Sequence, residues 1–261
     1  MPHPPLTPGD FRRLARAGTW TGPTAGCCPG FVQANLVILR AGDAGAFRRF
    51  CELNPRACPL VEVTDIGSPE PRRCAPGADI RTDLPRYRVF RDGLLEGELT
   101  DVTGLWTDDM VGFLIGCSFT FEAALLAAGV PVRHIEEGTN VPMFVTDIGC
   151  EPAQPFAGPV VVSMRPIPAD LVDRAVAVTA RYPRAHGAPL HIGDPAGIGI
   201  ADVSRPDFGD AVTVRPGEVP VFWACGVTPQ AALLAAKPEL AITHAPGHMF
   251  ITDLRDEDFR D

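Results

Sequence analysis

The spacing of apolar residues predicts a chain that alternates between helices and strands. The clearest helix covers residues 169–182, where apolar side chains recur on one face while charged ones lie elsewhere. That face carries Leu171, Ala175, Val178 and Tyr182. Further helices are predicted at residues 7–18, 44–53, 118–129 and 228–237.

Runs of four to ten apolar residues, rich in β-branched types, predict strands between these helices. They are FVQANLVIL, CPLVEVTDIG, DLPRYRVFRDG, VPMFVTDI, GPVVVSMRPI, PLHIGD, DAVTV, EVPVFWACG and AITHAPGHMFITD. Strands that alternate with helices indicate a mixed α/β architecture. The chain shows no internal repeat and no low-complexity linker, so we expect any subdomains to share a cleft.

Polar signals mark where several elements begin and end. Thr7 and Thr228 are predicted N-caps, because a proline follows each at the first helical position. Asp10, three residues after Thr7, completes a capping pattern. The last residues, 255–261, are polar and are predicted to fray.

Composition narrows the class of protein. The 261 residues are 46% hydrophobic and 21% charged, which is enough to bury a real core. A net charge of −9 argues against a nucleic-acid partner, since such proteins need a basic surface. No apolar run is long enough to span a bilayer, and no signal-peptide core is present. We therefore expect a soluble, cytoplasmic protein without a membrane partner.

Two residue types limit the chemistry. Lys237 is the single lysine, and it lies at the end of a predicted helix before a proline, so Schiff-base and pyridoxal chemistry are not expected. We expect no cofactor. The eight cysteines form no CxxC pair and are predicted to be free, mostly buried thiols. Cys117 and Cys225 stand at predicted helix starts, where a thiolate would be activated, but inert buried thiols are the favoured interpretation.

The common sequence fingerprints of catalysis are absent. There is no GxGxxG, GxxxxGK[ST], HExxH or GxSxG segment. His244 and His248 are four residues apart, a helical metal spacing, but Pro246 and Gly247 between them exclude a helix. A metal site carried by a loop remains open, without ligand spacing to support it.

Polar residues gather instead in short loops beside the strands. His134, His191, His244 and His248 lie in or next to Gly/Pro-rich segments, which need no imidazole in order to fold. Histidine is the natural acid or base near neutral pH, so we expect at least one of them to be catalytic. The competing interpretation is a set of buried, hydrogen-bonded histidines. Arginines in the same loops either form ion pairs that tie loops together or bind an anion.

Two strand-to-helix junctions favour an anionic ligand. Ser118 and Gly226 stand where a strand gives way to a helix. Free N–H groups and the positive end of the helix dipole suit a carboxylate or a developing oxyanion.

These segments together resemble one family, the D-glutamate cyclase family. The resemblance covers about Phe11 to Asp253. It is carried by TGPTAGCCPGFVQANL, FCELNPRACPL, DIRTDLPRYRVFRDG, FLIGCSFTFEAAL, RHIEEGTNVPMF, GPVVVSMRP, HGAPLHIGDP, PDFGDAV, GEVPVFWACGVTPQ and ITHAPGHMFITD. Bacterial members are described as hydro-lyases, and the named reaction closes D-glutamate to 5-oxo-D-proline with loss of water. The resemblance implies a three-layer α/β domain, from residues 1–115 with 225–261, and a smaller α+β subdomain, residues 116–224.

From the residue types we assign the roles that such a dehydration needs. An acid/base pair is predicted at His191 and at His244 or His248, with Asp194 orienting a histidine. Guanidinium groups would clamp the substrate carboxylate, and amides would bind another polar group. The predicted binding residues are Arg81, Arg165, Ser118, Asn140, Gln33 and Gly226.

Three other functions fit the same features. A dehydratase-cyclase acting on a larger intermediate, by dehydration and conjugate addition, would need a wide apolar pocket. A non-catalytic protein that binds a small acid would use the same arginines. A metal-dependent enzyme would use His and Cys ligands. A symmetric homodimer is the expected assembly.

Overall fold

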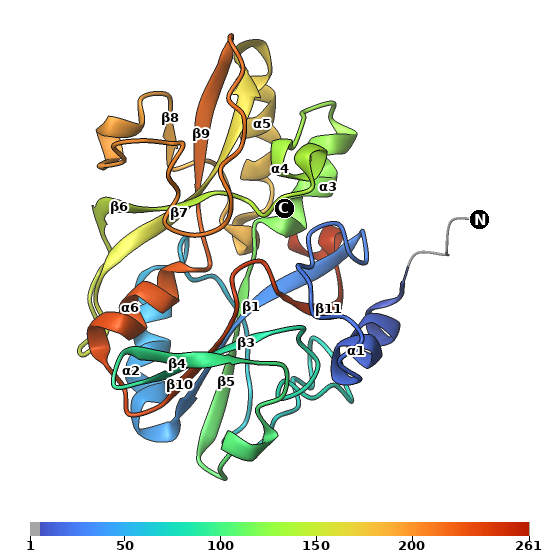
Figure 1. Ribbon diagram of the computed structural model, residues 1–261, viewed down its shortest axis with the longest axis vertical. Coiled ribbons are helices and arrows are strands. Elements are labelled where there is room, and N and C mark those ends of the chain that lie inside the picture. Colours follow the sequence, from blue (N-terminus) through green and yellow to red (C-terminus); the bar gives the residue numbers. More distant parts are fainter. Residues whose placement is uncertain (1–5, 261) are drawn as a thin grey trace.

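Two antiparallel sheets organise the chain in the computed structural model, which describes residues 6–260 (Figure 1). The larger sheet has the order β2-β5-β1-β10-β3-β4, and β11 also pairs with β1. Its strands are β1 (Phe31–Arg40), β2 (Leu60–Val63), β3 (Tyr87–Arg91), β4 (Leu94–Leu99), β5 (Met110–Gly116), β10 (Ala241–His244) and β11 (Phe250–Arg255). The mixed α/β class expected from the sequence is confirmed.

The smaller sheet has the order β6-β7-β9-β8 and fills the upper half of Figure 1. Its strands are β6 (Met143–Gly149), β7 (Pro159–Pro168), β8 (His191–Ile192) and β9 (Glu218–Ala224). The strands of the two sheets therefore come from separate parts of the sequence. The division into two subdomains stays a prediction, because both main apolar clusters combine residues of the two sheets, such as Leu36 with Trp223 and Phe113 with Phe222.

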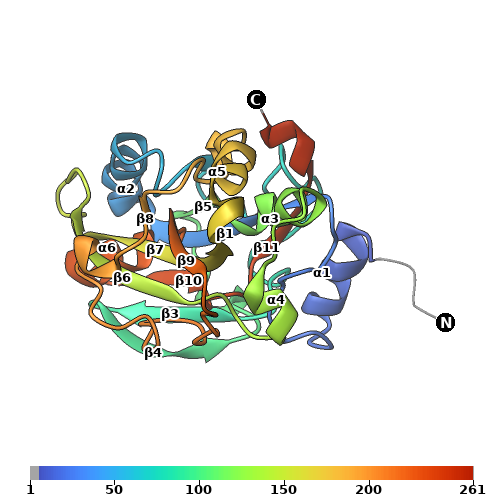
Figure 2. The same ribbon diagram turned by 90° about the horizontal axis from the view of Figure 1, so that it is seen from above.

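Six α-helices pack around the sheets within residues 6–260. They are α1 (Pro8–Arg16), α2 (Ala41–Leu53), α3 (Phe119–Ala127), α4 (Arg133–Glu137), α5 (Val172–Ala180) and α6 (Thr228–Ala236). Seen from above, α3, α5 and the C-terminal segment lie side by side on one flank (Figure 2). The predicted face of 169–182 is confirmed, because Ala175 and Tyr182 are buried and Leu171 and Val178 pack on the same core.

The central strand β1 explains why the larger sheet forms. Its eight inner residues are all buried, as expected of a strand covered on both faces. The predicted cap at Thr7 is also confirmed. The side chain of Thr7 accepts a hydrogen bond from Asp10 N (3.2 Å), and the Asp10 carboxylate accepts one from Thr7 N (3.3 Å).

Several local predictions are wrong. Thr228 is the first residue of α6 rather than its N-cap, and its hydroxyl donates to Cys225 O instead. Residues 210–214 form no strand. The segment AITHAPGHMFITD is two strands, because Pro246 and Gly247 turn the chain between β10 and β11.

The C-terminal segment is ordered, against the prediction that it frays. Residues Asp256–Phe259 form a short 3-10 helix, η5. Phe259 is 1% exposed, and the Arg184 guanidinium lies 4.1 Å from the centre of its ring. A buried aromatic ring thus anchors the segment. Residue 261 lies outside the described residues. No helix within residues 6–260 has the length and apolar character to cross a membrane.

Candidate functional site

The turn between β10 and β11, Ala245–His248, is held from three directions. Ala245 N donates to Arg86 O (2.9 Å), at the start of β3. Thr24 donates to Gly247 O through its backbone N–H (2.8 Å) and its hydroxyl (3.1 Å). Asn140 Nδ2 donates to Pro246 O (3.3 Å). Segments far apart in sequence therefore fix one short turn.

Glycine is required within this turn. Gly247 has φ +80°, a conformation that other residues adopt with strain. A Cβ at this position would lie 2.5 Å from Asn140 Nδ2. Asn140 is also bonded on its other side, since its Oδ1 accepts from Val141 N (3.0 Å). The Asn140 side chain, which was predicted to bind substrate, thus makes hydrogen bonds to backbone groups and supports the turn.

His248 ends the turn with a defined ring orientation. Its Nδ1 lies 2.9 Å from Pro246 O. A carbonyl oxygen can only accept, so Nδ1 carries the proton and Nε2 keeps its lone pair. Burial lowers the pKa of His248, the bond to Pro246 O offsets this in part, and the positive charge of Arg86 lowers it further. At neutral pH the ring is therefore a neutral base.

A cavity of about 360 Å³ opens beside this histidine. We call it the His248 cavity. It lies between the loops of the two sheets, and charged or polar side chains make up most of its wall. Its lining residues are Arg86, Arg88, Glu98, Asn140, Asp207, Phe208, Gly209, Ala245, Pro246 and His248. Two predicted site residues, Asn140 and His248, meet here.

Arg86 and Arg88 place two positive charges at the His248 cavity, beside the carboxylates of Glu98 and Asp207. Arg88 lies in β3 and Arg86 directly precedes the strand, so the two side chains, two residues apart, project to the same side. Glu98, directly opposite Arg88 in β4, accepts from Arg88 Nε (3.0 Å) and from Arg86 Nη1 (3.3 Å). Burial works to raise the pKa of Glu98, but the two arginines outweigh it and the pKa is lowered. Each guanidinium has five N–H donors, so most of them stay available for a ligand.

His244 lies close in sequence but is enclosed. It is 1% exposed, and its Nδ1 lies 3.2 Å from Leu36 N in β1. Burial lowers its pKa to about 4, so the ring is neutral. It is not among the residues that line the His248 cavity. The structure therefore separates the two histidines that the sequence placed together.

A second polar group is fully enclosed and centres on Arg165 of β7. The guanidinium donates to Ser163 Oγ and Ser118 Oγ (both 3.1 Å) and to Glu122 Oε1. Its plane is flanked by the rings of Phe121 and Trp223, at 5.3 and 5.4 Å. We call Arg165, Glu122, Ser118, Ser163 and His134 the Arg165 cluster; each is at most 4% exposed.

Glu122 supplies the negative charge of the Arg165 cluster. Burial alone would raise the pKa of Glu122, but the charges of His134 and Arg165 outweigh it and lower the pKa. His134 Nε2 lies 3.0 Å from Glu122 Oε1, yet it is not aligned as a hydrogen bond. The predicted pair Ser118 and Arg165 is thus brought together, but a substrate carboxylate would have to displace Glu122 to reach the guanidinium.

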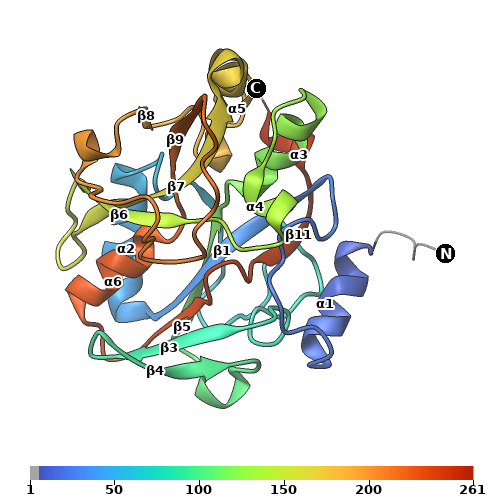
Figure 3. The ribbon, with the colours of Figure 1, turned by 45° about the horizontal axis from the view of Figure 1, so that its top comes forward.

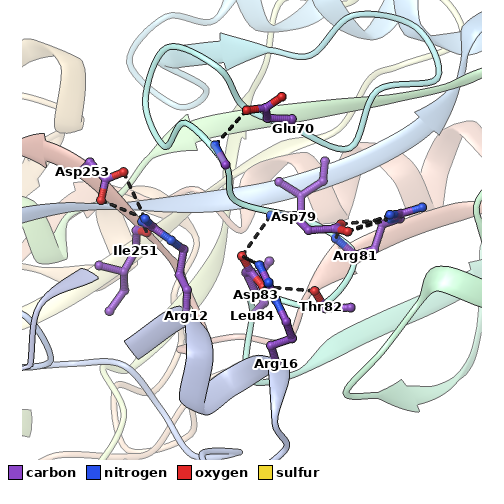
Figure 4. A network of polar contacts seen from close by, with 12 residues as sticks. Arg12, Arg16, Glu70, Asp79, Arg81, Thr82, Asp83, Leu84, Ile251 and Asp253 are labelled. Carbon is purple, nitrogen blue, oxygen red and sulfur yellow. Dashed lines mark hydrogen bonds and ion pairs between the residues drawn. The ribbon is translucent and has the colours of Figure 1, made fainter. Parts of the chain in front are cut away.

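Arg81, the other predicted clamp, belongs to a separate ion-pair network (Figure 4). Its guanidinium binds Asp79 at 2.7 to 3.2 Å and lies 5.8 Å from the ring centre of Trp106. Nearby, Arg16 pairs with Asp83, a buried carboxylate. The network ties α1 to the loop before β3 and shares no residue with the His248 cavity.

His191 and Asp194 sit at the edge of the smaller sheet. His191 is opposite Phe222 in β9, whereas Arg165 is opposite Val221, so the two side chains point to opposite faces. His191 Nε2 contacts Asp194 O (2.6 Å). The Asp194 carboxylate caps the next turn by accepting from Ala196 N (3.0 Å) and does not orient the ring.

Gln33 and Gly226 hold neighbouring parts of the chain in place. Gln33 Nε2 donates to Thr24 O (2.9 Å) and Cys27 O (3.2 Å). A Cβ on Gly226 would lie 1.8 Å from Asn35 Nδ2. Close packing of the β9–α6 junction on β1 therefore accounts for this glycine.

Burial makes the thiols of Cys117 and Cys225, at the two helix starts, unreactive. Burial raises the pKa of Cys225 to about 11 and that of Cys117 further. The eight cysteines are free, as predicted. Within residues 6–260 no three His, Cys, Asp or Glu side chains are grouped to hold a metal ion.

Sequence reasoning gave no role to Arg86, Arg88 or Glu98. A usable signal was present in PRYRVFR, where arginines alternate with apolar residues and so share one face of a strand. The pairing with Glu98 depends on the β3–β4 hairpin, and β4 was not predicted from the sequence.

The fold and the site define a mixed α/β protein with a polar cavity, lined by two arginines and a histidine, between the loops of two antiparallel sheets. The D-glutamate cyclase family model matches residues 111–253. A Stutzerimonas stutzeri protein named "Putative hydro-lyase" is 64% identical over 252 residues, covering 97% of this chain and 95% of the relative. A Bacillus subtilis protein named "Putative hydro-lyase YcsI" is 58% identical over 252 residues, covering 97% of this chain and 98% of the relative. This chain belongs to the D-glutamate cyclase family.

A solved structure of a nitrogen repressor-like protein from Methanococcus jannaschii aligns over 99% of both chains. Its TM-score is 0.44 and its sequence identity 11%, a similarity too low to bear on function.

Proposed function

We propose that this protein is a hydro-lyase that closes D-glutamate to 5-oxo-D-proline in the His248 cavity. The observation that carries the proposal is the neutral His248 ring, oriented by Pro246 O, at a cavity with two arginines. Family membership and the hydro-lyase names of the relatives support the reaction type. The substrate is small and carries carboxylates, which suits the volume of the cavity and the unused guanidinium N–H groups of its two arginines.

Ring closure of the neutral amine with the protonated γ-carboxyl group requires one proton to move from the nitrogen to the departing hydroxyl. The amine nitrogen attacks the γ-carboxyl carbon, a C–N bond forms, and a C–O bond breaks to release water. His248 Nε2 would accept the proton that the nitrogen loses and return it to the departing hydroxyl. Arg86 and Arg88 would hold a carboxylate with their free N–H groups. Glu98 would fix the two guanidinium groups, and the scheme needs no cofactor.

The character of the cavity favours this reaction over the dehydratase-cyclase alternative. A larger biosynthetic intermediate calls for a wide apolar pocket, whereas charged and polar side chains line most of the His248 cavity. A protein that only binds a small acid would use the same arginines but would leave D-glutamate unchanged. Turnover therefore separates these functions.

The test is incubation of the purified protein with D-glutamate and mass spectrometry for the product that has lost one water. His248→Gln should lower kcat/KM by about 10²–10⁴, because a positioned acid/base group contributes that much. His191→Gln is the matched control, since His191 lies at the edge of the smaller sheet and should retain the activity. No turnover, or loss in the His191 variant alone, would overturn the assignment to this cavity.

A further inference from the structure

A cavity of about 590 Å³ in the described chain has no part in the proposed reaction. It lies between α3, the end of α5 and the C-terminal segment 255–260, on the flank where these elements are neighbours in Figure 3. It shares no residue with the His248 cavity. We call it the α3–α5 cavity.

Its apolar floor comes from one face of α3. Ala123, Ala124, Ala127 and Ala128 line it, with Val178 and the ring of Tyr182 from the other side. Alanine methyl groups leave room that larger side chains would fill. The floor therefore suits an aliphatic or aromatic group of modest size.

Two polar atoms at this cavity are buried without a hydrogen-bond partner. Thr120 is 1% exposed and lines the cavity, and its Oγ1 has no partner in the described chain. Asp256 is partly buried and also lines the cavity, and its buried Oδ1 likewise has no hydrogen-bond partner in the described chain. Burial raises the pKa of Asp256 to about 7. Buried polar groups are nearly always hydrogen-bonded, so two such atoms at one cavity point to a ligand.

Three arginines complete the rim. Arg181, Arg255 and Arg260 line the cavity, and none forms an ion pair with a residue between 6 and 260. The Arg255 guanidinium is held 4.0 Å from the ring centre of Phe31, which fixes its place. Guanidinium groups bind carboxylates with two parallel hydrogen bonds.

We propose that the α3–α5 cavity binds a free α-amino acid with an apolar side chain, at a site separate from the reaction. The carboxylate of the amino acid pairs with Arg181 and Arg260. Its ammonium donates to Asp256 Oδ1 and meets the hydroxyl of Thr120. Its side chain rests on the alanines of α3.

The test is isothermal titration of the full-length protein with D- and L-leucine. Leucinamide, which lacks the carboxylate, and 4-methylpentanoate, which lacks the ammonium, should each bind about tenfold more weakly than the better leucine enantiomer. Arg181→Gln and Asp256→Asn should weaken leucine binding by a similar factor. Ala127→Trp should abolish binding by filling the floor. Arg49→Gln, an exposed arginine on α2 without a partner among the described residues, is the matched control and should bind normally.

Three outcomes would overturn the proposal. They are no binding of either enantiomer, equal binding in all variants, and 4-methylpentanoate binding as tightly as leucine. The experiment does not measure D-glutamate turnover, so its failure leaves the assignment of the His248 cavity unaffected. Likewise, an inactive protein that binds leucine at this cavity would support this proposal and sink the other.

Discussion

The His248 cavity and the Arg165 cluster contain the same kinds of side chain in opposite surroundings. Each combines arginine, histidine and glutamate. In the cavity, Arg88 and Glu98 are 25% and 33% exposed, and most guanidinium donors are unused. In the cluster, Arg165 is 0% exposed and its donors are taken by Glu122, Ser118 and Ser163. The two regions therefore differ in exposure and in unused hydrogen-bonding capacity rather than in residue type, and on this ground we propose the cavity, not the cluster, as the binding site.

Glu122→Gln should break the Arg165 cluster and produce the largest effect. Removing one partner of a buried ion pair leaves an unpaired buried charge, at a cost of about 3–5 kcal/mol. The free energy of unfolding in urea measures this loss. Glu52→Gln, in an exposed pair with Arg48 on α2, should cost less than about 1 kcal/mol. Equal losses in the two variants would mean that the Arg165 cluster is not the structural centre described here.

Acid should destabilise the folded protein through the buried, neutral histidine His186. Burial, and to a lesser degree the charge of Arg165, lowers the pKa of His186 to about 4. The unfolded chain binds the proton near pH 6.5 and the folded chain does not, so stability falls as the pH drops from about 6.5 to about 4. The loss is roughly 3 kcal/mol for a shift of this size.

His186→Asn tests this contribution, because asparagine tolerates the positive φ of 78° at this position. The variant should lose about 3 kcal/mol less than the wild type between pH 6.5 and 4. The measurement is urea unfolding at a series of pH values. Asp256 has a raised pKa, so its protonation changes stability in the opposite direction. It contributes equally in both proteins, and its effect cancels in the difference between them. Parallel curves would contradict the assignment.

Arg88→Gln should affect the open site in the opposite way. Loss of a bidentate contact to the substrate carboxylate should raise KM by about tenfold to a hundredfold, with kcat changed less. Stability should fall by less than about 1 kcal/mol, because the pair with Glu98 is partly exposed. Steady-state kinetics and thermal unfolding separate the two effects. A large stability loss with normal KM would place Arg88 with Arg165 as a structural residue.

Arg81→Gln should have the smallest effect. Arg81 and Asp79 are 28% and 25% exposed, and the pair lies in a network that is remote from the His248 cavity. We expect a stability change of about 1 kcal/mol or less and unchanged KM. A raised KM for D-glutamate would mean that Arg81 binds the substrate carboxylate. It would contradict the assignment of substrate binding to the His248 cavity and of a structural role to the network of Arg81.

Much of the architecture was predictable from local sequence. The box of Thr7 and Asp10, the apolar face of 169–182 and the β-branched run of β1 each depend on neighbours within one turn or strand. The candidate site was predicted less well. His248 and Asn140 meet at the cavity, whereas His191, Arg81 and Gln33 lie elsewhere with other partners.

The sequence by itself determined the helices and strands, the family, and the concentration of arginine and histidine beside strand ends. The tertiary structure alone decided which of those side chains are open to a ligand. That outcome depends on contacts between distant segments, such as β10 with β1 and Thr24 with Gly247. A strand's alternation shows which side chains share a face, but only the pairing and packing of the sheets show which face is covered.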